Sequence, residues 1–307
     1  MKGLRFGNAM LGTLVASLLH TALLAPAIAA DKKSITFAVI QTQEMSVLGT
    51  QWGETLKYIG KQIGADINFY ATTSYASVVE SMLSGFVDIG KLGPNIYIVA
   101  NEKSKGQLVP LVATARGPTL FYDQPCACYF GTLITRKGSG FETMGSLKGK
   151  TVALVDPAST SGNALPRALF PEAVGVTSLE DFFGKIFYSG SHSASALAVH
   201  SGKADAAFVS ETTLERVIEQ GKMAKDDLNY LWRSPKIMSD VITVNKKSLS
   251  DEMIGKLRDA FHGMSMTEEG RKVLKQTGYA AFLIAEDSDF DSLRAILAYE
   301  ERVKKKN

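Results

Sequence analysis

The sequence has few of the residues on which metal sites and disulfide frameworks depend. Its 307 residues include two cysteines and four histidines, and no Cys/His cluster has the spacing of a zinc site. One residue separates Cys126 from Cys128, so a disulfide between them would be strained. We interpret the pair as a local loop feature, either a disulfide or two free thiols, with metal binding as the weaker alternative. No metal site and no cofactor are predicted.

The sequence also lacks a marked excess of charge of either sign. The formal charge of +3 becomes +1 once Lys2 and Arg5, in the N-terminal segment, are set aside. A nearly neutral chain with both signs interspersed gives no argument for nucleic-acid binding. Two enzyme signatures are missing as well, namely Gly-x-Ser-x-Gly and the Gly-x-x-x-x-Gly-Lys-Ser/Thr phosphate loop.

The apolar run that could be a targeting segment stands at the N-terminus. Lys2 and Arg5 precede a mostly apolar stretch at 10–24, and Pro26 and small residues at 27–30 follow it. This pattern is typical of a cleaved secretory signal, and the run is shorter than the ~20 residues that a membrane span needs. We predict a signal peptide at 1–30 and a periplasmic or secreted mature protein; an uncleaved anchor is the weaker alternative.

Short β-type runs alternate with helical patterns through the rest of the chain, which predicts an α/β fold with mainly parallel sheets. Strands are expected at 35–40, 67–70, 88–92, 109–115, 129–136 and 151–155. Helices are expected at 52–63, 75–83, 251–264, 268–276 and 290–303. The pattern breaks near 117–128 and near 232–240. We therefore expect one lobe at 31–120 plus 238–307, and a second lobe at 121–237.

Two stretches, 75–89 and 192–206, match each other at a constant separation of 117 positions. In both, a helical pattern ends at Ser-Gly, and an Asp then precedes a strand of small residues. Tyr75 falls on His192 in this register. Helix–Gly–strand units recur in many α/β proteins, which is the weaker explanation. We interpret the match as two similar lobes, each aiming a helix N-terminus at a shared cleft outside the strand ends.

A Ser-Thr-Ser-Gly segment at 159–162 follows the predicted strand 151–155 and opens a predicted helix. The first N–H groups of a helix have no partner within it, and the helix dipole favours negative charge there. Hydroxyls and a glycine at such a position suit an oxyanion. An ordinary Ser/Thr N-cap is the plainer interpretation. Tyr75 and His192 at two other helix starts favour the oxyanion, because all these groups can donate hydrogen bonds to one ligand.

These residues resemble the periplasmic substrate-binding proteins of phosphate, phosphite and phosphonate ABC importers, the PhnD family. The similar stretches are Tyr75, 84–97, 156–162 and 190–205, which occur in order along nearly the whole mature chain. The resemblance implies a type 2 periplasmic-binding fold. In that fold, two α/β lobes with mainly parallel sheets flanked by helices are joined by two hinge crossings and trap a ligand between them.

The resemblance also implies which residues contact the ligand. Those that would hold the phosphonate oxygens are Ser159, Thr160, Ser161, His192 and Tyr75. The family places another aromatic hydroxyl before the first strand of the second lobe.

That further hydroxyl is assigned to Tyr129, with Tyr122 as second choice. In members that bind an aminoalkylphosphonate, acidic residues meet the ammonium group, and Glu211 and Asp240 stand at about those places. The alternatives are a helix-start acid for Glu211 and a loop residue for Asp240. Lys91 is either an added charge at the anion site or a surface residue.

The predicted function is therefore that of a solute-binding protein that delivers an oxyanion to the permease of an ABC importer, acting as a monomer. The resemblance favours an aminoalkylphosphonate such as 2-aminoethylphosphonate as the ligand; phosphite, phosphate and alkylphosphonates are the alternatives. A sensor-coupled binding protein of the same fold is another alternative. A hydrolase that uses Ser159 or Ser161 with His192 is a remote one, because nothing in the sequence assigns a third group to orient the histidine.

Overall fold

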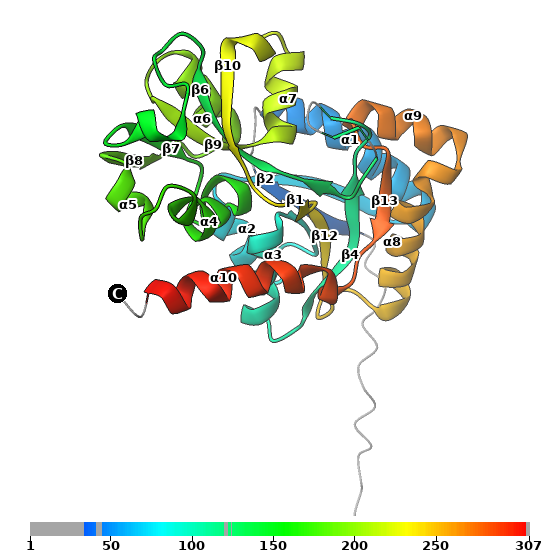
Figure 1. Ribbon diagram of the computed structural model, residues 1–307. Helices are drawn as coiled ribbons and strands as arrows, with labels where there is room; N and C mark the ends of the chain where they lie inside the picture. The colour runs from blue at the N-terminus through cyan, green and yellow to red at the C-terminus, as the bar shows by residue number, and fades with distance from the viewer. Residues whose placement is uncertain (1–33, 41–44, 120–121, 124, 305–307) are drawn as a thin grey trace, which may run out of the picture.

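Two β-sheets, each covered by helices on both faces, make up the computed structural model (Figure 1). It describes residues 34–40, 45–119, 122–123 and 125–304. The predicted signal segment 1–30 lies outside these residues. None of the helices in the described ranges has the length and apolar character needed to cross a bilayer.

The first sheet has six strands in the order β13-β4-β12-β3-β1-β2. Their bounds are β1 Ser34–Ile40, β2 Asp66–Thr72, β3 Ile89–Leu92, β4 Leu108–Ala115, β12 Val241–Asn245 and β13 Ala281–Ile284. β1 is parallel to both β2 and β3, whereas β12 is antiparallel to β3 and β4, and β13 is antiparallel to β4. Four strands thus run one way, and the two late strands run against them.

Helices bury both faces of this sheet. Those on one face are α1 Met45–Ile63, α8 Asp251–Gly263 and α9 Glu268–Thr277; those on the other are α2 Tyr75–Leu83, α3 Pro94–Lys103 and α10 Asp291–Lys304. Trp52 of α1 is 1% exposed and packs its ring against Phe37 and Phe282 of the sheet. The amphipathic pattern at 52–63 therefore places its apolar face as predicted.

The second sheet has five strands in the order β10-β6-β9-β7-β8. Their bounds are β6 Gly131–Arg136, β7 Thr151–Leu154, β8 Lys185–Tyr188, β9 Ala206–Ser210 and β10 Leu228–Arg233. Only β6 runs against the others. Around it lie α4 Leu165–Ala173, α5 Leu179–Phe182, α6 His192–His200 and α7 Glu211–Glu219.

The chain passes from the first sheet to the second between Ala115 and Gly131, and it returns between Arg233 and Val241. In these segments the short strands β5 (Cys128–Tyr129) and β11 (Ile237–Met238) pair antiparallel. One predicted lobe boundary falls between residues 120 and 121, which lie outside the described residues. The strand expected at 129–136 is interrupted, because Tyr129 pairs with β11 whereas Gly131 pairs with β9.

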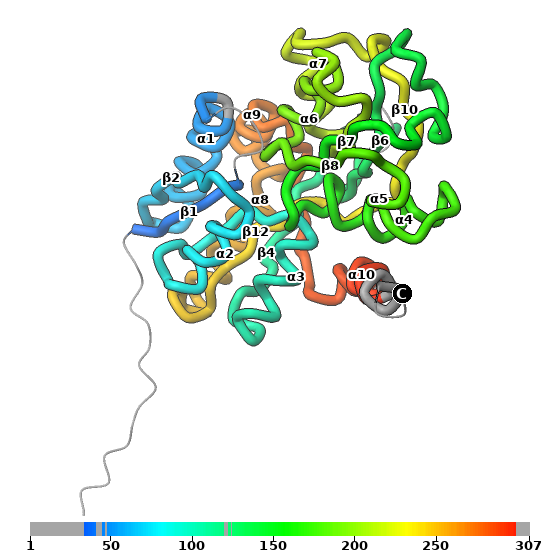
Figure 2. The backbone as a smooth tube through the Cα atoms, turned by 90° about the vertical axis from the view of Figure 1, so that its left-hand side faces the viewer, coloured from blue at the N-terminus to red at the C-terminus, as the bar shows by residue number. Residues whose placement is uncertain are grey.

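A third link between the two halves is α10. It packs against α4, and Leu293 shares an apolar cluster with Leu165. Figures 1 and 2 show this helix lying along the second half of the molecule, although its chain follows the first sheet. The C-terminal helix therefore spans both halves.

The internal match found in the sequence is a structural repeat. α2 and α6 each have nine residues and begin after a serine N-cap, at Tyr75 and His192 respectively. The aspartate after each helix accepts a hydrogen bond from a neighbouring strand, Asp88 from the N–H of Thr36 and Asp205 from the N–H of Thr151. Both aspartates thus fix the turn between a helix and its parallel strand.

Candidate functional site

A cavity of about 60 Å³ lies between the two sheets, lined by residues that follow strands of both. This is more than the roughly 10–15 Å³ that a single water needs. Six of the eight residues that the sequence assigns to the ligand line it, namely Tyr75, Tyr129, Ser159, Thr160, His192 and Asp240. Ser161 and Glu211 do not.

Ser159 is the N-cap of its helical turn, and this role does not exclude the contact with an oxyanion that the sequence left open. Its Oγ accepts a hydrogen bond from the N–H of Gly162 at 3.2 Å, which makes it an N-cap. A hydroxyl also has one proton to donate, so capping leaves Ser159 able to donate to a ligand. Gly162 is required at its position, because an added Cβ would lie 2.4 Å from the side chain of Val155. The loop is held against the end of β7 by this close approach.

Thr160 and Ser161 open a π-helical turn, Thr160–Ala164, that precedes α4. The Oγ1 of Thr160 accepts a hydrogen bond from the N–H of Asn95, in the first turn of α3, at 2.9 Å. Asn95 also donates from Nδ2 to the carbonyl of Ala158 at 3.0 Å. The loop that carries Thr160 in one half therefore touches a helix start of the other half.

The matched helices α2 and α6 both present their first residue to the cavity. Tyr75 is 5% exposed and His192 is 6% exposed. Burial raises the pKa of the Tyr75 phenol, although a hydrogen bond with Ser159 opposes the shift. Its hydroxyl therefore stays protonated and can donate.

His192 is held in one tautomer by its backbone neighbour. Its Nδ1 accepts a hydrogen bond from the N–H of Ser210 at 3.0 Å, so the proton of the neutral ring is on Nε2. Nε2 lies 3.5 Å from the Oγ of Ser159, on the cavity side. Burial lowers the pKa of His192 to about 4, so the ring is neutral at pH 7. It is a neutral hydrogen-bond donor to the cavity.

This tautomer argues against a hydrolase. A catalytic base needs a free Nε2 to accept the serine proton, and a carboxylate on Nδ1 to orient the ring. Here Nε2 carries the proton, and Nδ1 faces a backbone N–H. A distance of 3.5 Å is also too long for a well-formed hydrogen bond between Ser159 and His192.

Of the two candidate tyrosines, Tyr129 lines the cavity, whereas Tyr122 does not. Tyr129 hydrogen-bonds with Ser161 and Thr160, and burial followed by the charge of Asp240 raises its pKa. Ser161 therefore supports the site through Tyr129. Tyr122 packs its ring against Phe130, with the centroids 6.1 Å apart.

The two predicted acids have different surroundings. Asp240 lines the cavity and forms an ion pair with the ammonium of Lys91. Glu211 is 2% exposed, and its Oε2 has no hydrogen-bond partner among the described residues. Burial raises the pKa of the Glu211 carboxyl to about 7, against the opposing charge of Arg233. Its neighbours Ser210 and Thr212 line the cavity instead.

Sequence analysis assigned no role to Tyr279 or to two basic side chains, Arg116 and Arg216, all of which line the cavity. Their guanidinium carbons lie 5.0 Å and 5.9 Å from the centroid of the Tyr279 ring. Arg216 donates to the carbonyl of Thr277 at 3.4 Å, which is a second contact between the halves. No motif in the sequence marks these residues, because three distant segments bring them together.

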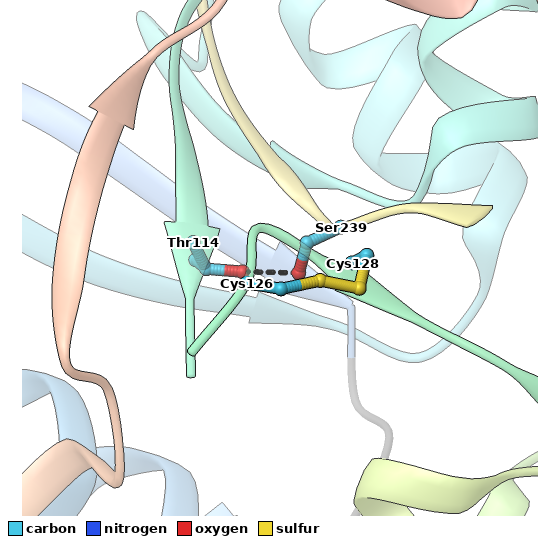
Figure 3. The surroundings of a disulfide bond; sticks show 4 residues. All are labelled: Thr114, Cys126, Cys128 and Ser239. Atoms are coloured by element: carbon cyan, nitrogen blue, oxygen red, sulfur yellow. Dashed lines mark hydrogen bonds between the residues drawn. A yellow bond between two sulfur atoms is a disulfide. The ribbon is translucent and has the colours of Figure 1, made fainter. Parts of the chain in front are cut away.

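The cysteine pair lies at the first crossing, outside the residues that line the cavity. Cys126 and Cys128 form a disulfide, and their Cα atoms are 5.1 Å apart (Figure 3). Beside them, the hydroxyls of Thr114 and Ser239 share a hydrogen bond of 2.8 Å that ties the end of β4 to the returning chain. Across the described ranges, no group of His, Cys, Asp and Glu is arranged to hold a metal ion.

Comparison with known proteins places this geometry in context. Residues 37–290 match the family model described as "ABC transporter, phosphonate, periplasmic substrate-binding protein". The chain is 29% identical to the phosphate-import protein PhnD of Mycolicibacterium smegmatis over 86% of this chain and 85% of that one. It is 28% identical to the phosphonates-binding periplasmic protein of Escherichia coli, over 91% and 80% of the two chains.

A solved structure gives the same picture. The binding protein component of an ABC phosphonate transporter from Pseudomonas aeruginosa superposes with a TM-score of 0.78 at 25% identity. The match covers 89% of this chain and 88% of that one. The two-sheet architecture is thus the type 2 periplasmic-binding fold that the sequence predicted.

Proposed function

Because the chain belongs to the family of periplasmic substrate-binding proteins of phosphonate ABC transporters, we propose that it captures a phosphonate-type oxyanion in the cavity and delivers it to the permease of an importer. The observation that carries this proposal is the convergence of uncharged donors on one cavity. Those donors are the hydroxyls of Ser159, Thr160, Tyr75 and Tyr129 and the Nε2–H of His192. A tetrahedral oxyanion has several acceptor oxygens, and hydrogen bonds to an ionised acceptor are roughly twice as strong as neutral ones.

Capture would work by closure of the two halves on the ligand. Asn95 contacts the Ser159–Thr160 loop, and Arg216 contacts the carbonyl of Thr277, so the two halves already touch at both sides of the cavity. An anion that bonds to Tyr75 on one half and to Ser159 on the other adds contacts that an open form lacks. These added contacts shift the equilibrium between the open and closed forms toward the closed form, by the difference in their free energies of ligand binding. The closed form then docks on the permease.

The experiment is calorimetry with phosphate, phosphite, methylphosphonate and 2-aminoethylphosphonate on the wild type and on a triple variant. Replacing Ser159, Thr160 and Ser161 together by Ala should abolish binding of every ligand that the wild type binds. Ser178→Ala is the matched control, because Ser178 caps α5 with the same geometry but does not line the cavity. Unchanged affinity in the triple variant would show that the anion binds elsewhere.

The resemblance by itself favours an aminoalkylphosphonate such as 2-aminoethylphosphonate as the ligand, and an alkylphosphonate, which brings no amine, is the alternative. That prediction depends on Glu211 and Asp240 reaching an ammonium group. Replacing either by Ala should weaken 2-aminoethylphosphonate much more than methylphosphonate if the prediction holds. Equal losses would show that neither carboxylate contacts an amine.

We also propose that residues 1–30 are a cleaved signal peptide, that residues 31–120 plus 238–307 and residues 121–237 close as two bodies, and that the mature chain works as a monomer in the periplasm. N-terminal sequencing of the exported protein tests the cleavage, and light scattering tests the monomer. A mature chain that starts at Met1, or one of twice the expected mass, would contradict the respective statement.

A further inference from the structure

Asp240 is occupied by a side chain of the protein itself. Lys91 lies on β3, and its ammonium forms an ion pair with Oδ2 of Asp240. The other oxygen, Oδ1, lies near Gly93 at the start of α3, where an added Cβ would be 3.7 Å away. Burial alone would lower the pKa of Lys91, but the Asp240 carboxylate outweighs it and the pKa is raised. The ammonium of Lys91 is therefore charged at pH 7.

Glu211 offers no replacement for Asp240. Its side chain does not line the cavity, and the nearest opposite charge is that of Arg233, a residue of the second half. Of the two carboxylates that could meet a ligand ammonium, Asp240 is thus paired with Lys91, and Glu211 does not reach the cavity.

The remaining charges in the cavity are positive. Arg116 and Arg216 line it beside Tyr279, and neither has a carboxylate partner within the ranges that the structure describes. Three cationic side chains against the single carboxylate of Asp240 leave two positive charges in excess. This excess complements a dianion and disfavours a ligand that brings a positive charge of its own.

We propose that Lys91 fills the position of a ligand amine, so that this protein selects a phosphonate-type dianion whose substituent carries no amine. The proposal rests on the proposed function of the same cavity and names its ligand class. An ammonium placed beside Asp240 would lie next to that of Lys91, and like charges at such a site repel strongly where water is excluded. Lys91 is thus the residue that determines specificity.

Ethylphosphonate and 2-aminoethylphosphonate are the matched probes, because they have the same two-carbon chain and differ only by the amine. By calorimetry, the wild type should bind ethylphosphonate at least tenfold more tightly than 2-aminoethylphosphonate. In Lys91→Met, which keeps an unbranched side chain one atom shorter and removes its charge, Asp240 is free to pair with an amine. That variant should reverse the preference, or reduce it at least tenfold.

Lys61→Met is the control, because Lys61 is exposed and pairs with Glu269 on the outer surface. It should keep the wild-type preference. Asp240→Asn is a second variant that does not depend on the folding of Lys91→Met. It leaves the charge of Lys91 in the cavity without its partner, so it should strengthen ethylphosphonate binding and increase the discrimination against the amine.

The failures of the two proposals are distinguishable. A wild type that binds 2-aminoethylphosphonate as tightly as ethylphosphonate would overturn the role of Lys91 and leave the oxyanion site standing. The role of Lys91 would also be overturned if the preference for ethylphosphonate over 2-aminoethylphosphonate were unchanged in both Lys91→Met and Asp240→Asn. Failure of the wild type to bind any of the oxyanions would instead contradict the proposed function, and the role of Lys91 with it.

Discussion

Acidification from pH 7 to pH 5 should weaken the fold through His192. The folded protein holds the pKa of this ring at about 4 by burial, below its ordinary value of 6.5. The unfolded chain therefore takes up a proton at a pH at which the folded chain does not. The stability that the neutral ring contributes is complete above pH 6.5 and is lost as the pH falls toward 4.

The size of this loss follows from the difference between the two pKa values. One pKa unit corresponds to about 1.4 kcal/mol, so His192 alone should lower the free energy of unfolding by about 2 kcal/mol between pH 7 and pH 5. The buried carboxyl of Glu211, whose pKa is raised to about 7, acts in the opposite direction over this range, so the contribution of His192 is read from the difference between the wild type and a His192 variant. His192 is 6% exposed, so solvent screens the effect little. A saturating phosphonate should reduce the loss, because a bound dianion favours the protonated ring.

Urea unfolding at the two pH values, followed by circular dichroism, measures the loss. His192→Gln keeps a neutral N–H donor but cannot titrate, so it should lose about 2 kcal/mol less than the wild type over this range. His200→Gln, at the far end of the same helix α6, is the control and should behave like the wild type. Equal losses in the wild type and His192→Gln would refute the assignment of a buried neutral ring.

Three further predictions follow from the cavity and its contacts. Asn95→Ala removes the donors that reach Thr160 and Ala158, so closure should be less favourable and calorimetry should show phosphonate affinity lowered about three- to tenfold, with the melting temperature of the free protein nearly unchanged. Gly162→Ala sets a Cβ against the side chain of Val155, so thermal unfolding should show a loss of about 1–3 kcal/mol. Tyr75→Phe removes one donor to an ionised ligand, so affinity should fall about tenfold or more, whereas an unchanged dissociation constant would exclude this tyrosine from the site.

The repeat of 75–89 at 192–206 and the Ser-Thr-Ser-Gly segment at 159–162 were visible in the sequence because their signals are local. A helix that ends at Gly85 or Gly202 and the aspartate that follows it are visible in a few consecutive residues. The structure shows why an aspartate stands at this place in both copies, because Asp88 and Asp205 each accept a hydrogen bond from the backbone of a neighbouring strand. Once both helix starts are placed at strand ends of one cleft, Tyr75 and His192 must face it.

The pairing of charges in the cavity was not predictable, because it depends on contacts between distant segments. Lys91 meets Asp240 since β12 returns antiparallel to β3, with Ile242 opposite Lys91. At Glu211 the predicted position differs by one residue from those that face the cavity, Ser210 and Thr212. At a helix start, a shift of one residue turns a side chain away from the site.

The direction of individual strands within each sheet could not be predicted from the sequence either. The alternation of strands and helices predicted mainly parallel sheets, yet β6, β12 and β13 run against their neighbours. β6 and β12 each follow a passage between the halves, and β13 follows α8 and α9. Their direction follows from the path of the chain and not from the composition of the strands.

A crystal structure of the mature protein grown with methylphosphonate tests the central claim most directly. The account predicts a phosphonate group between the two sheets, with its oxygens within hydrogen-bonding distance of Ser159, Thr160, Tyr75 and the Nε2 of His192. An anion bound only at Arg116 and Arg216, or a cavity that holds water alone at saturating ligand, would contradict it.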